Sequence, residues 1–208
     1  MIRFALLFAA IASSVGFAQA KTVEDKRTVT TFNEIERGVY LGANGGFWAT
    51  IVPPGRAGEP RPFLGGQAVQ IELGYDIGER VSAGLFFLGA TTNRAGSDYK
   101  GLSTKTTPTS GDYGMIVPGV TAKIRLVGFA DNQDVKRSWF YVRVALGYVF
   151  YSPTALIPQS DVLISAGPGI EYFTRLRHFS IGVEANFNFL ALTSSVGFSI
   201  LPTVRYAF

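Results

Sequence analysis

The sequence predicts an all-β protein, an eight-stranded antiparallel up-and-down transmembrane β-barrel with a short N-terminal periplasmic tail. Apolar residues occupy every second position up to the last residue, Phe208, as in a strand with one apolar face. Only 16% of the residues are charged, whereas a soluble domain has about a quarter. After residue 20, no apolar run approaches the ~20 residues of a membrane-spanning helix. A closed barrel is the remaining way to satisfy backbone hydrogen bonds in lipid.

The first 20 residues have the pattern of a secretory signal peptide. Arg3 precedes an apolar stretch at 4–16, and Ala18-Gln19-Ala20 is an A-x-A cleavage pattern. The apolar stretch is too short to span a bilayer. We therefore expect a signal peptide at 1–20 and a periplasmic tail at 21–37, either disordered or a short helix that plugs the barrel. No cysteine is present, so neither a disulfide framework nor a thiolate metal site is expected.

The remainder, residues 38–208, divides into eight segments in which an apolar row alternates with a row of small and polar residues. The clearest segment, 67–77, reads Gln-Ala-Val-Gln-Ile-Glu-Leu-Gly-Tyr-Asp-Ile. Such alternation predicts strands that can cross an outer membrane when tilted. The expected strands are 38–48, 67–77, 81–90, 113–127, 139–151, 161–173, 179–190 and 196–208.

An even number of strands places the first and last residues of the barrel on the same side of the membrane, which is predicted to be the periplasm. Long outer loops and short inner turns are the usual pattern of such barrels. Two connections fit it less well, because the turn at 128–138 is long and the last outer loop is short. The expected periplasmic turns are 78–80, 128–138 and 174–178, and the expected outer loops are 49–66, 91–112, 152–160 and 191–195.

The apolar row is expected to face lipid, since it carries almost no charge along its whole length. Glycines concentrate on the opposite row, as at Gly74, Gly119 and Gly167, and the narrow lumen of an eight-stranded barrel needs small residues. Aromatic residues near the strand ends, such as Tyr75 and Phe179, are typical of girdles at membrane interfaces. The alternative is a soluble lipocalin-like barrel with the apolar row inside.

The signal-like start, the eight alternating segments and the terminal Phe208 resemble the small outer-membrane barrels of the OmpA-barrel and OmpX type. The resemblance covers 38–208 and rests on pattern, so it implies a fold and an outer-membrane location rather than an activity. It also implies that the bacterial barrel assembly machinery reads the last strand, with Val204, Tyr206 and Phe208 as the assembly signal.

Charged residues on the inward rows form the main candidate site. A charge in a narrow lumen of low dielectric needs a partner, so the equal number of acids and bases predicts a network of ion pairs. The network either fills the lumen as a structural core or acts as a gated polar conduit. Side chains can just fill an eight-stranded lumen, which favours the core. The predicted members are Glu72, Asp76, Lys123, Arg125, Arg143, Glu171, Glu184 and Arg205.

No motif points to catalysis. The only histidine, His178, falls in a predicted periplasmic turn, whereas lipid-modifying enzymes of the outer membrane generally act near the outer leaflet. Neither G-x-S-x-G nor H-E-x-x-H occurs, and no cofactor is expected. The formal charge of +4 is too small and scattered for nucleic-acid binding.

These observations indicate a non-enzymatic outer-membrane protein with a structural or adhesive role, or a subunit of an envelope-spanning assembly of the motility or secretion type. A small-solute channel is one alternative. An envelope lipid-modifying enzyme is another, which the position of His178 argues against. The expected partners are outer-membrane lipid, the barrel assembly machinery and other envelope proteins, but not nucleic acid.

Overall fold

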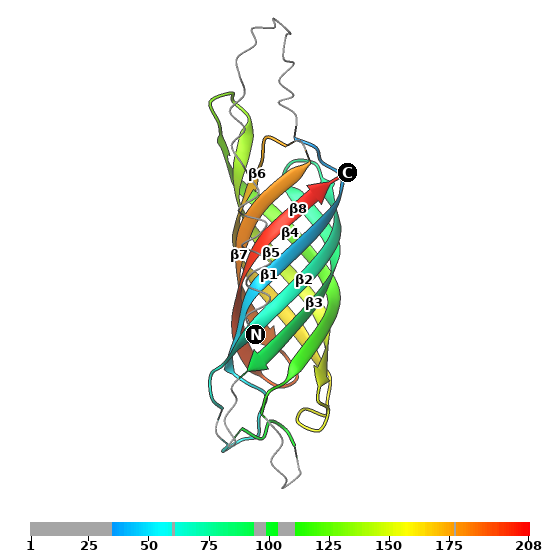
Figure 1. Ribbon diagram of the computed structural model, residues 1–208, viewed down its shortest axis with the longest axis vertical. Helices are drawn as coiled ribbons and strands as arrows, with labels where there is room; N and C mark the ends of the chain where they lie inside the picture. Colours follow the sequence, from blue (N-terminus) through cyan, green and yellow to red (C-terminus); the bar gives the residue numbers. More distant parts are fainter. Residues whose placement is uncertain (1–34, 60, 94–98, 104–110, 177) are drawn as a thin grey trace, which may run out of the picture. The chain divides into compact units, whose positions relative to one another are not determined.

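The computed structural model describes residues 35–59, 61–93, 99–103, 111–176 and 178–208. These residues form a closed barrel of antiparallel strands in which each strand pairs with its neighbours in chain order and β8 pairs with β1 (Figure 1). The predicted fold class is confirmed. The expected signal peptide and most of the expected tail lie outside the described residues. The strands are β1 (Val39–Val52), β2 (Leu64–Ile77), β3 (Val81–Asn93), β4 (Gly114–Ala130), β5 (Lys136–Ser152), β6 (Asp161–Phe173), β7 (Phe179–Leu190) and β8 (Ser195–Ala207).

The barrel has two ends with different connections. At one end, here called the terminal end, β1 begins and β8 ends, and the Phe208 amide donates to the Val39 carbonyl at 2.9 Å. The tight turns β2–β3, β4–β5 and β6–β7 lie at the same end. The opposite end, the loop end, carries the connections that follow β1, β3, β5 and β7. In Figure 1 the terminal end is uppermost, where the arrow of β8 points.

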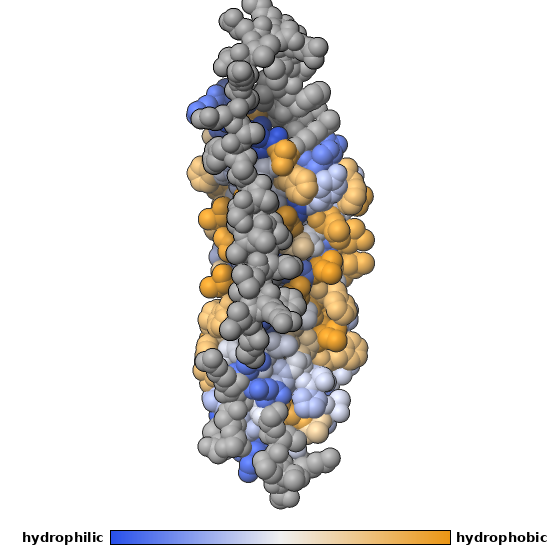
Figure 2. All heavy atoms as spheres, in the orientation of Figure 1, coloured by the Kyte–Doolittle hydropathy of each residue, from blue (hydrophilic) through white to orange (hydrophobic). Residues whose placement is uncertain are grey.

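The two rows of each strand face opposite sides of the wall, as the alternation predicts. The outward row is exposed and apolar, with Val69 and Leu85 exposed to 63% and 61%. The inward row is buried and holds the charged side chains. Figure 2 shows hydrophobic residues over the middle of the visible barrel surface and hydrophilic ones toward its ends. No helix within the described ranges is long and apolar enough to cross a membrane.

The expected turn at 128–138 is mostly strand, which corrects the sequence-based boundary. Phe129 pairs with Ser138 and Ala130 with Lys136, so the turn itself is confined to 131–135. Its polar residues suggested a longer turn, but polar side chains are compatible with pairing where a hairpin extends beyond the apolar band of the barrel. In Figure 1 this hairpin rises at the upper left of the barrel.

Asp131 organises that tight turn. Its carboxylate accepts hydrogen bonds from the Gln133 amide at 2.8 Å, the Val135 amide at 3.2 Å and Arg137 Nε at 2.8 Å. The hydrogen bond from the Gln133 amide is the largest cause that lowers the pKa of Asp131, and the hydrogen bond from Arg137 is the next. The carboxylate therefore accepts hydrogen bonds from amides of the turn that would otherwise need backbone carbonyls as acceptors.

Candidate functional site: the barrel lumen

The eight charged residues predicted for the lumen come together as two rings of four, each alternating acid and base. The first ring, at the terminal end, takes one residue from each even-numbered strand. Arg125 lies 3.3 Å from Asp76 and 3.0 Å from Glu171. Arg205 contacts Asp76 and lies 3.5 Å from Glu171. We call these four residues the terminal quartet; each cation in it bridges both acids.

The second ring lies deeper in the barrel and is also cyclic. Lys123 Nζ lies 3.3 Å from Glu72 and 3.2 Å from Glu184. Arg143 Nε lies 3.9 Å from Glu72 and 3.5 Å from Glu184. We call these four residues the central quartet. All its side chains are buried, so the ion pairs must compensate the cost of removing the charges from water.

Hydroxyl groups donate further hydrogen bonds to the carboxylates of both rings. Two tyrosines occupy equivalent places, since Tyr40 donates to Glu72 at 2.6 Å and Tyr141 donates to Glu184 at 2.9 Å. Lys123 lies between them, 6.0 and 5.7 Å from the two ring centroids. In the terminal quartet, serines donate the matching bonds. The sequence placed both tyrosines on the inward rows but did not identify them as partners of the acids.

A glycine makes room for each tyrosine. Tyr40 pairs with Gly74 across β1 and β2, and Tyr141 pairs with Gly169 across β5 and β6. A Cβ on either glycine would overlap the tyrosine ring opposite. Each ring therefore occupies the space that a side chain at the glycine would fill, and its hydroxyl reaches an acid of the central quartet. A glycine opposite an inward tyrosine was the sequence signal that could have identified this pair.

The half of the lumen toward the loop end is apolar. Trp48, Leu88, Met115, Val149 and Leu163 are buried there with other members of one cluster. The charged quartets are thus confined to the half that contains the terminal end. A hydrated ion that crossed the barrel would have to enter this mainly apolar half, where the buried acid Asp161 is already engaged by the Thr193 and Tyr151 hydroxyls.

Segments of three connections at the loop end cover the mainly apolar half. The Tyr99 hydroxyl donates to the Pro54 carbonyl at 2.7 Å, and the Leu102 amide donates to the Leu156 carbonyl at 2.9 Å. Leu156 and Ile157 are fully buried beneath them. At the mouth, burial raises the pKa of Tyr113 to about 12.

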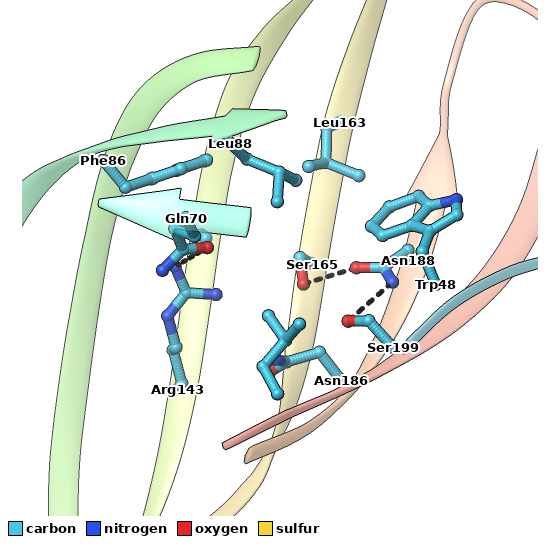
Figure 3. Close-up of a pocket in the computed structure, with 12 residues that line it drawn as sticks. Trp48, Gln70, Phe86, Leu88, Arg143, Leu163, Ser165, Asn186, Asn188 and Ser199 are labelled. Atoms are coloured by element: carbon cyan, nitrogen blue, oxygen red, sulfur yellow. Dashed lines mark hydrogen bonds between the residues drawn. The ribbon is translucent and has the colours of Figure 1, made fainter. Parts of the chain in front are cut away.

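A small cavity lies where the polar and apolar halves meet. Its volume is about 10 Å³, which is room for about one water molecule. Figure 3 shows Arg143 and Gln70 on one side and the polar chain Ser165, Asn188 and Ser199 on the other. The Ser165 hydroxyl donates to Asn188 at 2.8 Å, and Asn188 donates to Ser199 at 3.1 Å. This cavity does not provide a path for solutes through the described barrel.

Asp161, which the sequence did not single out, is a buried acid at the loop end. Its carboxylate accepts hydrogen bonds from the Leu192 amide at 2.7 Å, the Thr193 amide at 3.1 Å and the Tyr151 hydroxyl at 3.2 Å. The Thr193 hydroxyl also donates to it. Asp161 therefore holds the short β7–β8 connection against β6, a structural role that a sequence cannot predict before strand pairing is known.

The terminal mouth is narrowed by Arg37, the last residue of the expected tail. Arg37 donates to the Glu79 carbonyl at 2.9 Å, and its guanidinium lies 5.6 Å from the Phe173 ring centroid. Partial burial is the largest cause that lowers the pKa of Arg37, and the nearby positive charge of Arg125 is the next. Arg37 thus lies over the terminal quartet rather than in free solvent.

The predicted assembly-signal residues lie on the outward face beside the only histidine. Val204 and Phe208 are exposed, and the Tyr206 ring contacts Phe208 with a centroid distance of 5.0 Å. His178 stacks on Tyr206 and its Nδ1 lies 2.8 Å from the Ala207 carbonyl oxygen. Among the described residues, no group of three or more His, Cys, Asp and Glu side chains could hold a metal ion.

Comparisons with solved structures agree with this architecture. Neisserial surface protein A (NspA) matches 84% of this chain and 100% of its own, with 13% identity and a TM-score of 0.58. Ail, the attachment invasion locus protein of Yersinia pestis, matches 82% of this chain and 99% of its own, with 14% identity and a TM-score of 0.42. No protein-family model and no curated protein matches. The likeness to small eight-stranded outer-membrane barrels is therefore confirmed as one of fold.

Proposed function

We propose that the protein is a non-enzymatic outer-membrane barrel whose lumen is a filled core, and that it works through its surfaces as a structural, adhesive or scaffold component of the envelope. The observation that carries this proposal is the lumen itself. Two neutral quartets fill one half, a mainly apolar cluster fills the other, and the cavity between them has a volume of only about 10 Å³.

The outward face supports the membrane location. Large apolar side chains on it, such as Leu73, Phe87 and Ile170, are exposed to 51–55%, and burying the exposed half of such a side chain in lipid is favourable by about 0.8–1.5 kcal/mol. We infer that both termini of the chain face the periplasm, and that Val204, Tyr206 and Phe208 are read by the barrel assembly machinery. A role as a subunit of a motility- or secretion-type assembly fits a barrel that presents surfaces rather than a pore.

Conductance in planar bilayers tests the proposal against the channel alternative. The purified barrel is expected to insert, to migrate differently on gels with and without boiling, and to give no conductance above the baseline. The heat-dependent migration follows from a closed ring of paired backbone groups, which resists detergent until it is heated. Insertion accompanied by discrete conductance steps would show that the quartets form a gate, and the filled-lumen proposal would then be wrong.

A further inference from the structure

The small cavity between the polar and apolar halves of the lumen has walls that suit a polar molecule. Half of its lining residues are polar or charged, and they project from five different strands (Figure 3). All of these polar residues are buried. A cavity with polar walls holds water, whereas a wholly apolar cavity stays dry. The polar lining residues are Gln70, Arg143, Ser165, Asn186, Asn188 and Ser199.

Most of these polar side chains have partners, but Asn186 keeps one polar atom without any. Gln70 accepts a hydrogen bond from Arg143 at 3.2 Å. The side-chain nitrogen of Asn186 donates to Glu184 at 3.5 Å, and its Oδ1 has no hydrogen-bond partner within the described residues. Asn186 is 3% exposed, and a buried acceptor without a donor is costly. Asn186 therefore needs a donor that none of the described residues supplies.

Two other groups on the cavity wall have protons to donate. Ser199 Oγ accepts from Asn188 at 3.1 Å, and its own proton has no acceptor within the described part of the chain. Arg143 Nε makes no hydrogen bond to a described residue, although it lies 3.5 Å from Glu184. The residues around the cavity thus combine one unpaired acceptor with two donors. A matching ligand must donate one hydrogen bond and accept others.

Water meets these requirements, whereas small ions do not. A water molecule both donates and accepts hydrogen bonds, and the cavity volume of about 10 Å³ is room for about one. A halide ion only accepts hydrogen bonds, so it would leave the Asn186 acceptor unpaired. A metal cation pairs with oxygen ligands, but here it would lie beside the Arg143 guanidinium, whose like charge repels it.

We propose that the cavity is a binding site for one ordered water molecule, which donates to Asn186 Oδ1 and accepts from the Ser199 hydroxyl and the Arg143 guanidinium. The water joins the central quartet, through Arg143, to the polar chain on β6, β7 and β8. The inference deepens the proposed function and rests on it, because a single water fixed by protein groups belongs to a filled core. A conduit would instead hold a continuous file of exchanging waters.

The test is a crystal structure of the barrel at a resolution that shows ordered water, with a second data set from crystals grown in bromide. The wild type is expected to show one isolated peak within hydrogen-bond distance of Asn186 Oδ1 and Ser199 Oγ, without anomalous signal from bromide. Asn186→Leu keeps the branched shape but removes the acceptor, so it should abolish the peak. Asn44→Leu should retain the peak, because Asn44 is also buried but does not line the cavity. Ala145→Val should fill the cavity and abolish the peak with Asn186 intact, whereas Ala68→Val, which is buried away from the cavity, should retain it.

The outcomes separate the water site from the proposed function. A folded wild-type barrel with an empty cavity, or with bromide in it, would refute the water site and leave the filled lumen intact. A peak that persists in Asn186→Leu, or one that is lost equally in Asn44→Leu, would overturn Asn186 as the group that holds the water. A continuous file of waters from the cavity to both mouths would refute the filled-lumen function as well as the site.

Discussion

Replacing Arg143 with leucine tests the central quartet most directly. Arg143 is 2% exposed and lies within 3.9 Å of Glu72 and 3.5 Å of Glu184, and it donates to Gln70 at 3.2 Å. Its removal leaves two buried acids to share Lys123 alone. Breaking a buried ion pair by deleting one partner costs about 3–5 kcal/mol, so the free energy of unfolding should fall by that amount. The measurement is urea unfolding of the barrel in vesicles, followed by tryptophan fluorescence.

The central quartet also predicts which second change repairs the loss. Glu184→Gln in the Arg143→Leu background removes the surplus negative charge and keeps an oxygen that accepts the Tyr141 hydroxyl, so it should recover about half of the lost stability. Val144→Ala, an adjacent change on the lipid-facing row, is the control for a general effect on β5. A loss below about 1 kcal/mol for Arg143→Leu, the value of an exposed pair, would refute the account of a compensated buried ring. A double variant that is no more stable than Arg143→Leu alone would also refute this account.

Three further changes test other parts of the barrel. Polar replacement of both Tyr206 and Phe208 should lower the amount of protein in the outer membrane, as measured by fractionation and immunoblotting; unchanged levels would argue against an assembly signal. Asp131→Ala should destabilise the β4–β5 turn at neutral pH. Because the pKa of Asp131 is lowered on folding, this contribution is present above the ordinary aspartate pKa and is lost as the pH falls through the lowered value. The difference in unfolding midpoint should therefore vanish in acid, and a pH-independent difference would contradict the reasoning. Gly169→Ala should displace Tyr141 from Glu184 and lower the unfolding midpoint, whereas Gly45→Ala, whose Cβ has its nearest neighbour at 3.9 Å, should not.

The sequence predicted which side chains face inward and which face outward, because this assignment depends on a local pattern. With a period of two, a shift of one residue would move every charged side chain to the outward apolar face. The rows were therefore assigned correctly without knowledge of tertiary structure. All eight residues predicted for the lumen network lie buried in it, since a charge on the outward row would be costly.

The pairing inside the lumen was not predictable from the same pattern. Asp76 on β2 meets Arg125 on β4, two strands away, and these residues are not partners in any ladder. Which side chains meet across the lumen depends on strand tilt and stagger around the closed ring, which are properties of the whole barrel. For the same reason the pattern does not say which acids contact Arg143, and the fold brings it to Glu72 and Glu184.

The terminal quartet links the closing of the barrel to the register of its last strand. Arg205 on β8 supplies one of the two cations that Asp76 and Glu171 share, and its guanidinium lies 3.6 Å from the Tyr40 ring centroid on β1. Without Arg205, both acids depend on Arg125 alone. A slip of β8 by one residue would turn Arg205 toward lipid and leave the quartet with a net negative charge. Correct closure is therefore favoured by lumen electrostatics as well as by backbone pairing, and the structural value of the filled lumen lies in this specificity.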